Sequence, residues 1–210
     1  MPDIKNAYIY SKDFEDRLKA KFPKDNTNHL QWSDEDIADI RSDIREFYRQ
    51  QQKGKCAYCM NDLSLSAAAN CQVEHVVPKS SHPNFITESR NLCVACADCN
   101  GIKKDKPVTV KDNLARYPKT GNAFKIVHPH FDCFDDHIYE VNGYYLDITD
   151  KGAHTIQICK LNRKLHKLRY VDDETDFAEM TILSTAFLNE KDERKRKLIM
   201  KKMKKLLIFT

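Results

Sequence analysis

Residues 56–104 contain three strings that belong together: CAYC at 56–59, QVEHVVPKS at 72–80 and NLCVACADCNGIKK at 91–104. The first and third strings each hold a Cys-x-x-Cys pair, Cys56 with Cys59 and Cys96 with Cys99. Two such pairs supply four thiolates, which close a tetrahedral zinc site and leave no coordination position open for a substrate. The sequence therefore predicts a structural Zn²⁺ that holds a scaffold, with the residues between the pairs available for other chemistry.

The segment between and after the cysteine pairs has the pattern of a small ββα unit. Apolar and polar residues alternate over 71–77, which predicts a short strand that ends before Pro78. Residues 78–90 are polar and rich in turn formers, so we expect a connecting loop. Residues 91–95 are then expected to return as the partner strand, and 97–104 to form a short helix. Strand, loop, strand and helix around a metal define a ββα-metal unit.

Glu74 and His75 are adjacent in this segment, and their side chains are of the types that hydrolysis requires. Phosphodiester hydrolysis needs an activated water and a cation on the phosphate and leaving oxygen. Histidine titrates near neutrality and suits the general base, whereas Mg²⁺ prefers oxygen ligands such as Glu carboxylates and Asn carbonyls. Because adjacent strand residues point to opposite faces, Glu74 and His75 can serve one site only if the strand ends or bends there, as Pro78 indicates.

These strings resemble the HNH endonucleases, a branch of the ββα-metal (His-Me finger) nucleases. His75 matches the first His, Asn91 the central Asn, and Asn100, directly after a Cys-x-x-Cys pair, the third position of the zinc-containing subgroup. The resemblance implies that His75 is the general base, that Glu74 and Asn100 bind a catalytic Mg²⁺ or Mn²⁺, and that Asn91 ties the loop that orients His75. Glu74 stands where many relatives have Asp or His. The lysines of the same strings are expected to contact nucleic-acid phosphates: Lys79, Lys103 and Lys104.

A longer and looser resemblance covers residues 46–171, which look like the small HNH proteins of bacterial defence systems. In Septu-type and certain retron systems, such a protein is paired with an ATPase. The resemblance implies a nuclease effector of anti-phage defence with a partner ATPase, and it makes the C-terminal helices a candidate docking surface. Amphipathic helices that belong to a single core explain these helices equally well.

The expected fold class is α+β: a ββα-metal HNH core with a four-cysteine zinc site, flanked by N- and C-terminal helices and a β-hairpin. We expect an N-terminal arm and helix over 1–54, the nuclease core over 55–125, and a hairpin and helical region over 126–210 that packs on the core or on a partner. The N-terminal helix is predicted to start at Ser33 as N-cap and to stop at Gly54.

Further elements are predicted on both sides of the hairpin. A helix is expected over 109–116, and Asn142-Gly143 predicts a two-residue turn in a hairpin over 138–148. Leu161, Leu165, Leu168 and Val171 mark a further helix, and two amphipathic helices are expected at about 173–188 and 190–208.

Charge and cysteine content fit a nucleic-acid partner and a reducing compartment. The chain has 210 residues and a net charge of +4, with nine basic and two acidic side chains over 191–205 and nine against four over 78–125. Such clustering suits a polyanion, although a solvated helix face explains 191–205 as well. The first twenty residues lack an apolar run and no stretch is long enough to span a membrane, so we expect a cytoplasmic location, where eight cysteines favour metal binding over disulfides.

Two other function classes remain open at this point. One is a catalytically silent, zinc-containing module that binds nucleic acid, and the other is an adaptor that docks on an ATPase. The combination of His75 with Asn100 favours the nuclease, because a pure binder needs neither. A second metal or phosphate site at His128, His130 and His137 is a further alternative, and a polar turn before the hairpin is the simpler interpretation.

Overall fold

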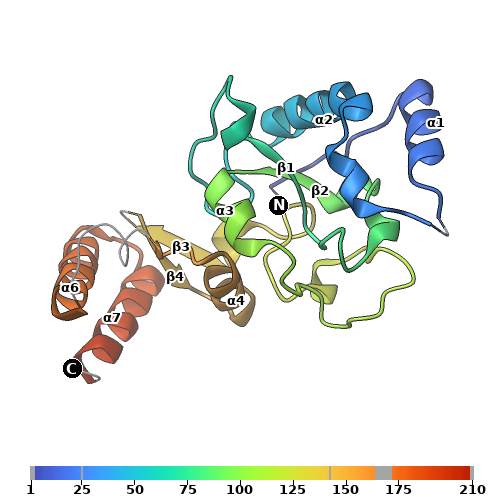
Figure 1. The fold of residues 1–210 in the computed structure, drawn as a ribbon. Helices are drawn as coiled ribbons and strands as arrows, with labels where there is room; N and C mark the ends of the chain where they lie inside the picture. Colours follow the sequence, from blue (N-terminus) through green and yellow to red (C-terminus); the bar gives the residue numbers. More distant parts are fainter. Residues whose placement is uncertain (1–2, 25, 142, 164–171, 209–210) are drawn as a thin grey trace. The chain divides into compact units, whose positions relative to one another are not determined.

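The computed structural model describes four stretches of the chain, 3–24, 26–141, 143–163 and 172–208 (Figure 1). Helices and two small antiparallel sheets make up the described residues, which confirms the α+β class.

The chain divides into two compact units, Met1–Phe134 and Asp135–Thr210. The division falls later than the boundary predicted between residues 125 and 126. The reason is that the segment after residue 125 packs within the first unit, where Ile126 is fully buried and the Ile4 N–H donates to the Pro129 carbonyl at 2.8 Å.

Before the first Cys-x-x-Cys pair, the described residues form four helical segments: α1 Lys12–Lys21, η1 His29–Ser33, η2 Glu35–Ile37 and α2 Ala38–Gln51. The face of α2 that carries Ile40 and Ile44 is fully buried and packs on the β1–β2 sheet described next. Ser33 was predicted to be the N-cap of this helix, and this prediction is wrong. Ser33 ends the η1 turn, and α2 begins only at Ala38. Gly54, at φ +72°, adopts the left-handed conformation that is common just after the end of a helix, as expected for the glycine that follows α2.

The central segment has the predicted ββα order: η3 Ala68–Asn70, β1 Gln72–His75, η4 Pro83–Phe85, η5 Ser89–Asn91, β2 Leu92–Ala95 and α3 Ala97–Lys103. The two strands are antiparallel, with Gln72 opposite Ala95 and His75 opposite Leu92. Cys96 is the N-cap of helix α3, and its Sγ accepts a hydrogen bond from the Cys99 N–H at 3.4 Å. The strand–loop–strand–helix prediction is therefore confirmed.

Between α3 and residue 137 the chain consists of turns, bends and irregular segments, apart from η6 Gly121–Ala123 and η7 Phe134–Asp136, and the helix predicted over 109–116 is wrong. Thr109 forms an isolated antiparallel bridge with Phe124. The Val110 N–H donates to the Ala123 carbonyl at 2.9 Å, so the backbone there bonds across the chain instead of along a helix.

The second unit contains the predicted hairpin, β3 Ile138–Val141 and β4 Tyr144–Asp147, followed by α4 Asp150–Cys159, α6 Asp172–Asn189 and α7 Glu193–Ile208. Gly143 lies at φ +81° in the two-residue connection, while its predicted partner Asn142 is outside the described residues. Thr149 caps α4 by accepting the Gly152 N–H at 3.2 Å, and this helix was not predicted.

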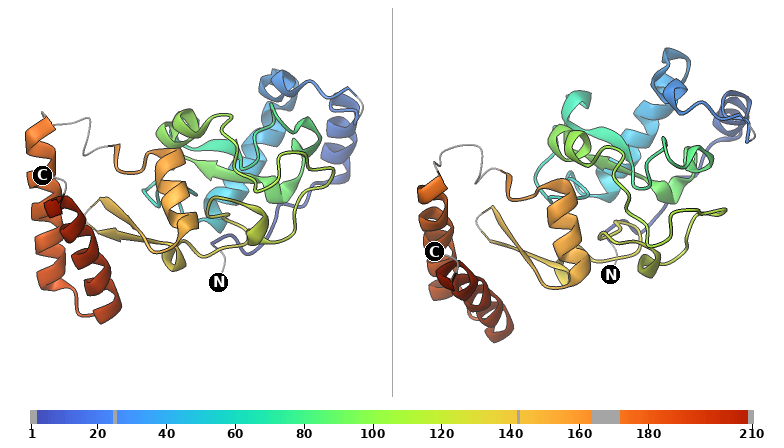
Figure 2. Two further views of the ribbon diagram at one scale, coloured as in Figure 1. Left: turned by 90° about the horizontal axis from the view of Figure 1, so that it is seen from below. Right: turned by 60° about the horizontal axis from the view of Figure 1, so that its bottom comes forward.

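Helices α6 and α7 lie side by side, as both views in Figure 2 show, and they match in position the two helices expected at about 173–188 and 190–208. Leu183 and Ile199 are fully buried and pack with Tyr144 and Leu146 of the hairpin. The helix predicted from Leu161, Leu165, Leu168 and Val171 falls largely on residues outside the described ones. Among the described helices, none is long and apolar enough to cross a membrane.

Candidate active site and metal centre

The four cysteines of the two Cys-x-x-Cys pairs meet in space, with all Sγ atoms within 4.8 Å of one another: Cys56, Cys59, Cys96 and Cys99. Cys59 Sγ and Cys96 Sγ are 3.9 Å apart. A tetrahedral ion with Zn–S bonds of about 2.3 Å holds its sulfurs about 3.8 Å apart, so the cluster fits a zinc site. All four side chains are buried, and hydrogen bonds from the other three thiols lower the pKa of Cys96.

Strand β1 ends at His75, and this end brings His75 and Glu74 to one cleft. The Val76 N–H donates to the Asn91 carbonyl at 2.8 Å, and the chain then leaves the strand toward Pro78. The condition set by the strand geometry, that β1 must end or bend at this point, is therefore met.

One hydrogen bond fixes the tautomer of the His75 ring. Its Nε2 lies 3.0 Å from the Ile86 carbonyl oxygen, which can only accept, so Nε2 carries the proton and Nδ1 keeps its lone pair. Burial lowers the pKa of His75 to about 3, because a buried imidazolium is poorly solvated. At neutral pH the ring is thus uncharged, with one nitrogen able to accept a proton.

Asn91 connects the end of β1 to the loop that holds His75. It is fully buried, and its Oδ1 accepts the Val77 N–H at 2.7 Å. Its Nδ2 donates to the carbonyls of Val77 and Phe85, each at 3.1 Å. Because Phe85 precedes Ile86, these bonds also hold the carbonyl that binds the His75 ring.

The Glu74 carboxylate lies beside a buried ammonium. Lys103 Nζ is 2.7 Å from Glu74 Oε1 and also donates to the His75 carbonyl at 3.0 Å. The Tyr58 hydroxyl donates to the same Oε1 at 3.3 Å. Burial raises the pKa of Glu74, and Lys103 and Tyr58 oppose this shift.

The cleft has a volume of about 370 Å³ and collects five of the seven catalytic and phosphate-binding residues predicted from the sequence. It is lined by His29, Glu74, His75, Pro78, Lys79, Ser80, Asn100, Lys104 and Asp105. Asn100 Nδ2 donates to Gln72 Oε1 at 2.7 Å, which turns the amide nitrogen toward β1. Desolvation lowers the pKa of the half-buried Lys79.

Lys103 differs from its expected placement. Its side chain is completely buried and its ammonium is bound to Glu74 and to the His75 carbonyl, so it is not positioned to contact a phosphate. Of the three predicted phosphate-binding lysines, Lys79 and Lys104 line the cleft. A lysine of helix α3 one turn from the second cysteine pair points inward, and sequence reasoning did not distinguish it from its exposed neighbour.

Two residues at the site were missed from the sequence, His29 and Trp32. Both belong to η1 of the N-terminal arm, and the Trp32 ring packs edge-to-face on the His75 ring at a centroid distance of 4.7 Å. The one available signal was that Trp32 is the chain's single tryptophan, within a stretch with no strong periodicity.

The histidines near the hairpin do not gather into a second metal cluster among the described residues. His128 Nε2 is 2.7 Å from the Tyr117 hydroxyl, and His130 Nε2 donates to the Leu92 carbonyl at 2.7 Å. His137 Nδ1 is 2.8 Å from Thr149 Oγ1. Within the described residues, the cysteine cluster is the group of metal-binding side chains that the structure brings together.

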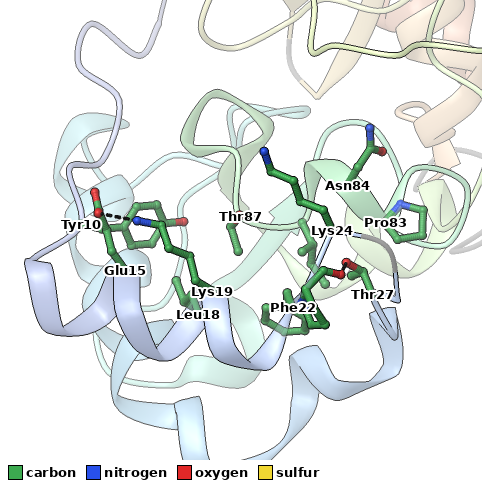
Figure 3. Close-up of a pocket in the computed structure, with 12 residues that line it drawn as sticks. Tyr10, Glu15, Leu18, Lys19, Phe22, Lys24, Thr27, Pro83, Asn84 and Thr87 are labelled. Atoms are coloured by element: carbon green, nitrogen blue, oxygen red, sulfur yellow. Dashed lines mark hydrogen bonds and ion pairs between the residues drawn. The ribbon is translucent and has the colours of Figure 1, made fainter.

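A second cavity of about 420 Å³ lies between α1 and the 83–87 loop, with Lys19 and Lys24 among the side chains around it (Figure 3). Its apolar lining includes Leu18, Phe22 and Ile86. Lys19 is paired with Glu15 at 3.0 Å. None of the site residues predicted from the sequence lines this cavity.

Comparison with known proteins agrees with this geometry. Residues 56–106 match the family model of the HNH endonucleases, and this segment is an HNH endonuclease domain. The chain is similar to the Septu protein PtuB of Bacillus thuringiensis, with 32% identity over 122 residues. The match covers 58% of this chain and 41% of that protein, so the chain corresponds to less than half of its relative's length. No solved structure matches the chain.

Proposed function

We propose that this protein is a metal-dependent nuclease that hydrolyses phosphodiester bonds of nucleic acid, with DNA as the favoured substrate. The observation that carries the proposal is the single cleft shared by His75, Glu74 and Asn100, next to Lys79 and Lys104. This combination offers a base, oxygen ligands for a divalent cation, and positive charge for a phosphate.

In this proposal, His75 takes the proton from the attacking water. Its Nε2–H bond to Ile86 leaves Nδ1 to accept that proton, and Asn91 keeps the supporting loop in place. Lys79 and Lys104 hold the phosphate by charge, and such contacts position a nucleic acid without reading its sequence.

A catalytic Mg²⁺ or Mn²⁺ fits the oxygen atoms on this side of the cleft. The hydrogen bonds from Lys103 and Tyr58 both end on Glu74 Oε1, which leaves Oε2 as the oxygen to bind the cation. Asn100 would contribute Oδ1, since its Nδ2 is engaged by Gln72. Such an ion, when bound, stabilises negative charge on the phosphate and the leaving oxygen.

The similarity to a Septu protein supports a role as the effector of a bacterial anti-phage defence system, in the cytoplasm. A partner ATPase belongs to the same proposal. The C-terminal helices α6 and α7 are the candidate surface for that partner, and α7 carries eight of the chain's 35 Lys and Arg residues.

The Glu74–Lys103 ion pair favours one alternative, a catalytically silent module that binds nucleic acid or docks on an ATPase. A lysine that neutralises the carboxylate weakens its attraction for a cation. The nuclease remains the better proposal because His75 has a fixed tautomer that a silent module does not need.

The test is cleavage of plasmid, linear and single-stranded DNA and of RNA, with Mg²⁺, with Mn²⁺ and without a divalent ion. Wild type is compared with His75→Ala and with His154→Ala, a half-buried histidine of α4 outside the site. We expect metal-dependent cleavage that His75→Ala abolishes and His154→Ala leaves intact, at unchanged zinc content. Cleavage by His75→Ala at the wild-type rate, or none by wild type even with a co-purified ATPase, contradicts the proposal.

A further inference from the structure

The η1 turn, which precedes the HNH domain, forms one side of the cleft. His29 is the first residue of this turn and lines the cleft together with Glu74, His75 and Asn100. Trp32, on the same turn, is buried and packs on the His75 ring. The turn thus contacts the proposed general base and also places a second imidazole at the cleft.

Side chains from α2 and from the segment between α1 and the turn hold this turn in place. Arg41 Nη1 of α2 donates to the Trp32 carbonyl at 2.7 Å and to the Asp34 carbonyl at 2.6 Å. Phe22, after α1, lies 6.2 Å from the Trp32 ring between centroids. Asn28 Oδ1 accepts the Leu30 N–H at 3.1 Å and so caps the turn beside His29. His29 is therefore carried by an anchored element.

The His29 imidazole is available for a ligand. It is half-buried, and among the described parts of the chain it has no hydrogen-bond or ion-pair partner. The other histidines of the first unit are all engaged by neighbouring groups: His75, His82, His128 and His130.

The charges around the cleft suit a phosphate. Lys79 and Lys104 line it, and its acidic side chains are Asp105 and Glu74. Because Lys103 already neutralises Glu74, the two cleft lysines face one unpaired carboxylate. An imidazole N–H next to this positive charge is a hydrogen-bond donor for a phosphate oxygen.

We propose that His29 contacts the substrate, with its imidazole donating a hydrogen bond to a non-bridging oxygen of a phosphate bound in the cleft. The active site then extends beyond residues 56–106 to include the η1 turn. This inference rests on the proposed nuclease function, because it needs a nucleic-acid phosphate in the same cleft.

The experiment uses the full chain and four variants: His29→Ala, His29→Lys, His75→Ala and His154→Ala. Binding of labelled single- and double-stranded DNA and of RNA is measured by fluorescence anisotropy at several salt concentrations without a divalent ion. Cleavage is measured with Mg²⁺ or Mn²⁺, and KM and kcat are separated. Zinc content and thermal unfolding confirm that each variant is folded.

For His29→Ala we expect binding weakened on the order of tenfold, with KM raised more than kcat is lowered. The dependence of log K on log salt should become shallower by up to about one phosphate contact. His29→Lys places an ammonium donor at the same position and should recover both affinity and salt dependence, and His154→Ala should match wild type. A purely structural residue would not change the salt dependence and would not be rescued by lysine.

Each contrary result has a defined meaning. His29→Ala that binds and cleaves like His154→Ala overturns the inference and leaves the nuclease proposal standing. Weakened binding that His29→Lys does not restore, or that accompanies loss of zinc, also overturns it. A wild type that binds but does not cut, even with a co-purified ATPase, removes the nuclease proposal, and the salt dependence still decides whether His29 contacts a phosphate. A wild type that binds no nucleic acid overturns both.

Discussion

Asn91 illustrates how one buried amide positions a site that it does not itself line. It joins the strand that carries His75 to the loop whose carbonyl binds the His75 ring. We predict that Asn91→Ala lowers the free energy of unfolding by about 3 kcal/mol, because it leaves buried backbone groups of Val77 and Phe85 unpaired. Cleavage should fall sharply as well, since the His75 ring loses its orientation. Urea unfolding and the cleavage assay check the two effects.

The matched control for Asn91 is Asn84→Ala, in the same loop. Asn84 is exposed, so this variant should change the free energy of unfolding by less than about 0.5 kcal/mol. If the two variants are equally stable and equally active, the role assigned to Asn91 is wrong.

The Glu74–Lys103 pair should be strongly coupled, because both side chains are buried. We predict that Lys103→Met costs about 3 kcal/mol of unfolding free energy, since it leaves the Glu74 carboxylate without its cation. Adding Glu74→Gln to Lys103→Met should recover part of this loss. A double-mutant cycle by chemical denaturation measures the coupling energy. Strict additivity of the two substitutions would show that the pair does not interact in solution.

His130 should make stability depend on pH. Burial lowers its pKa in the folded protein to about 4, from an ordinary value of 6.5. Between these values the unfolded chain binds more protons than the folded one, so unfolding free energy rises with pH across this window. The contribution is complete above about pH 6.5 and is lost as the pH falls toward 4, by about 3 kcal/mol in all.

The comparison that isolates His130 is with His130→Gln, which retains an N–H donor for the Leu92 carbonyl but does not titrate. Its unfolding free energy, measured by denaturation from pH 4 to 7, should change less with pH than that of wild type. Parallel curves for the two proteins would exclude His130 as a source of the dependence. Other titrating groups, His75 included, remain in both proteins and cancel.

At the level of elements, replacing each of two glycines by alanine is expected to change the free energy of unfolding in opposite directions. Gly54 lies at φ +72° and a Cβ there would meet nothing within 4 Å, so Gly54→Ala tests the left-handed backbone alone. We predict a loss of about 1 kcal/mol for Gly54→Ala. Gly101→Ala, inside α3 with equally open space, should instead be neutral or stabilising by up to about 1 kcal/mol. Thermal unfolding of both variants checks the opposite signs.

The elements that sequence predicted best are those with short-range signals. The cysteine pairs and the Glu74-His75 dipeptide are local patterns, and the ββα order around them is confirmed. The predicted helix over 109–116 failed because the backbone at its start pairs across the chain, with Thr109 opposite Phe124 and Val110 bonded to Ala123, a pairing that no local pattern reveals. His29 was missed for a similar reason, since it reaches the cleft only after the chain has folded around His75.

At the level of the whole molecule, stability is expected to be divided between the two units. The first unit contains the cysteine cluster, whereas the second is held by a hydrophobic cluster that includes Leu183 and Ile199. Because only one unit contains the metal ligands, removal of zinc should affect the units unequally. A single cooperative transition for the chain is therefore not expected in the absence of metal.

We predict one zinc ion per chain and loss of the first unit's fold when a chelator removes it. Binding to a structural zinc site is worth on the order of 10 kcal/mol, which is comparable to the stability of a whole domain. Helices α6 and α7 should persist, so circular dichroism should show only a partial loss of helical signal. The fluorescence of Trp32, which lies in the first unit, should reach the value of the unfolded chain. Cys99→Ser should reproduce this loss, and Cys133→Ser, outside the cluster, should keep both zinc and fold. Zinc-free protein with unchanged Trp32 fluorescence would show that the four thiols are not a structural metal site.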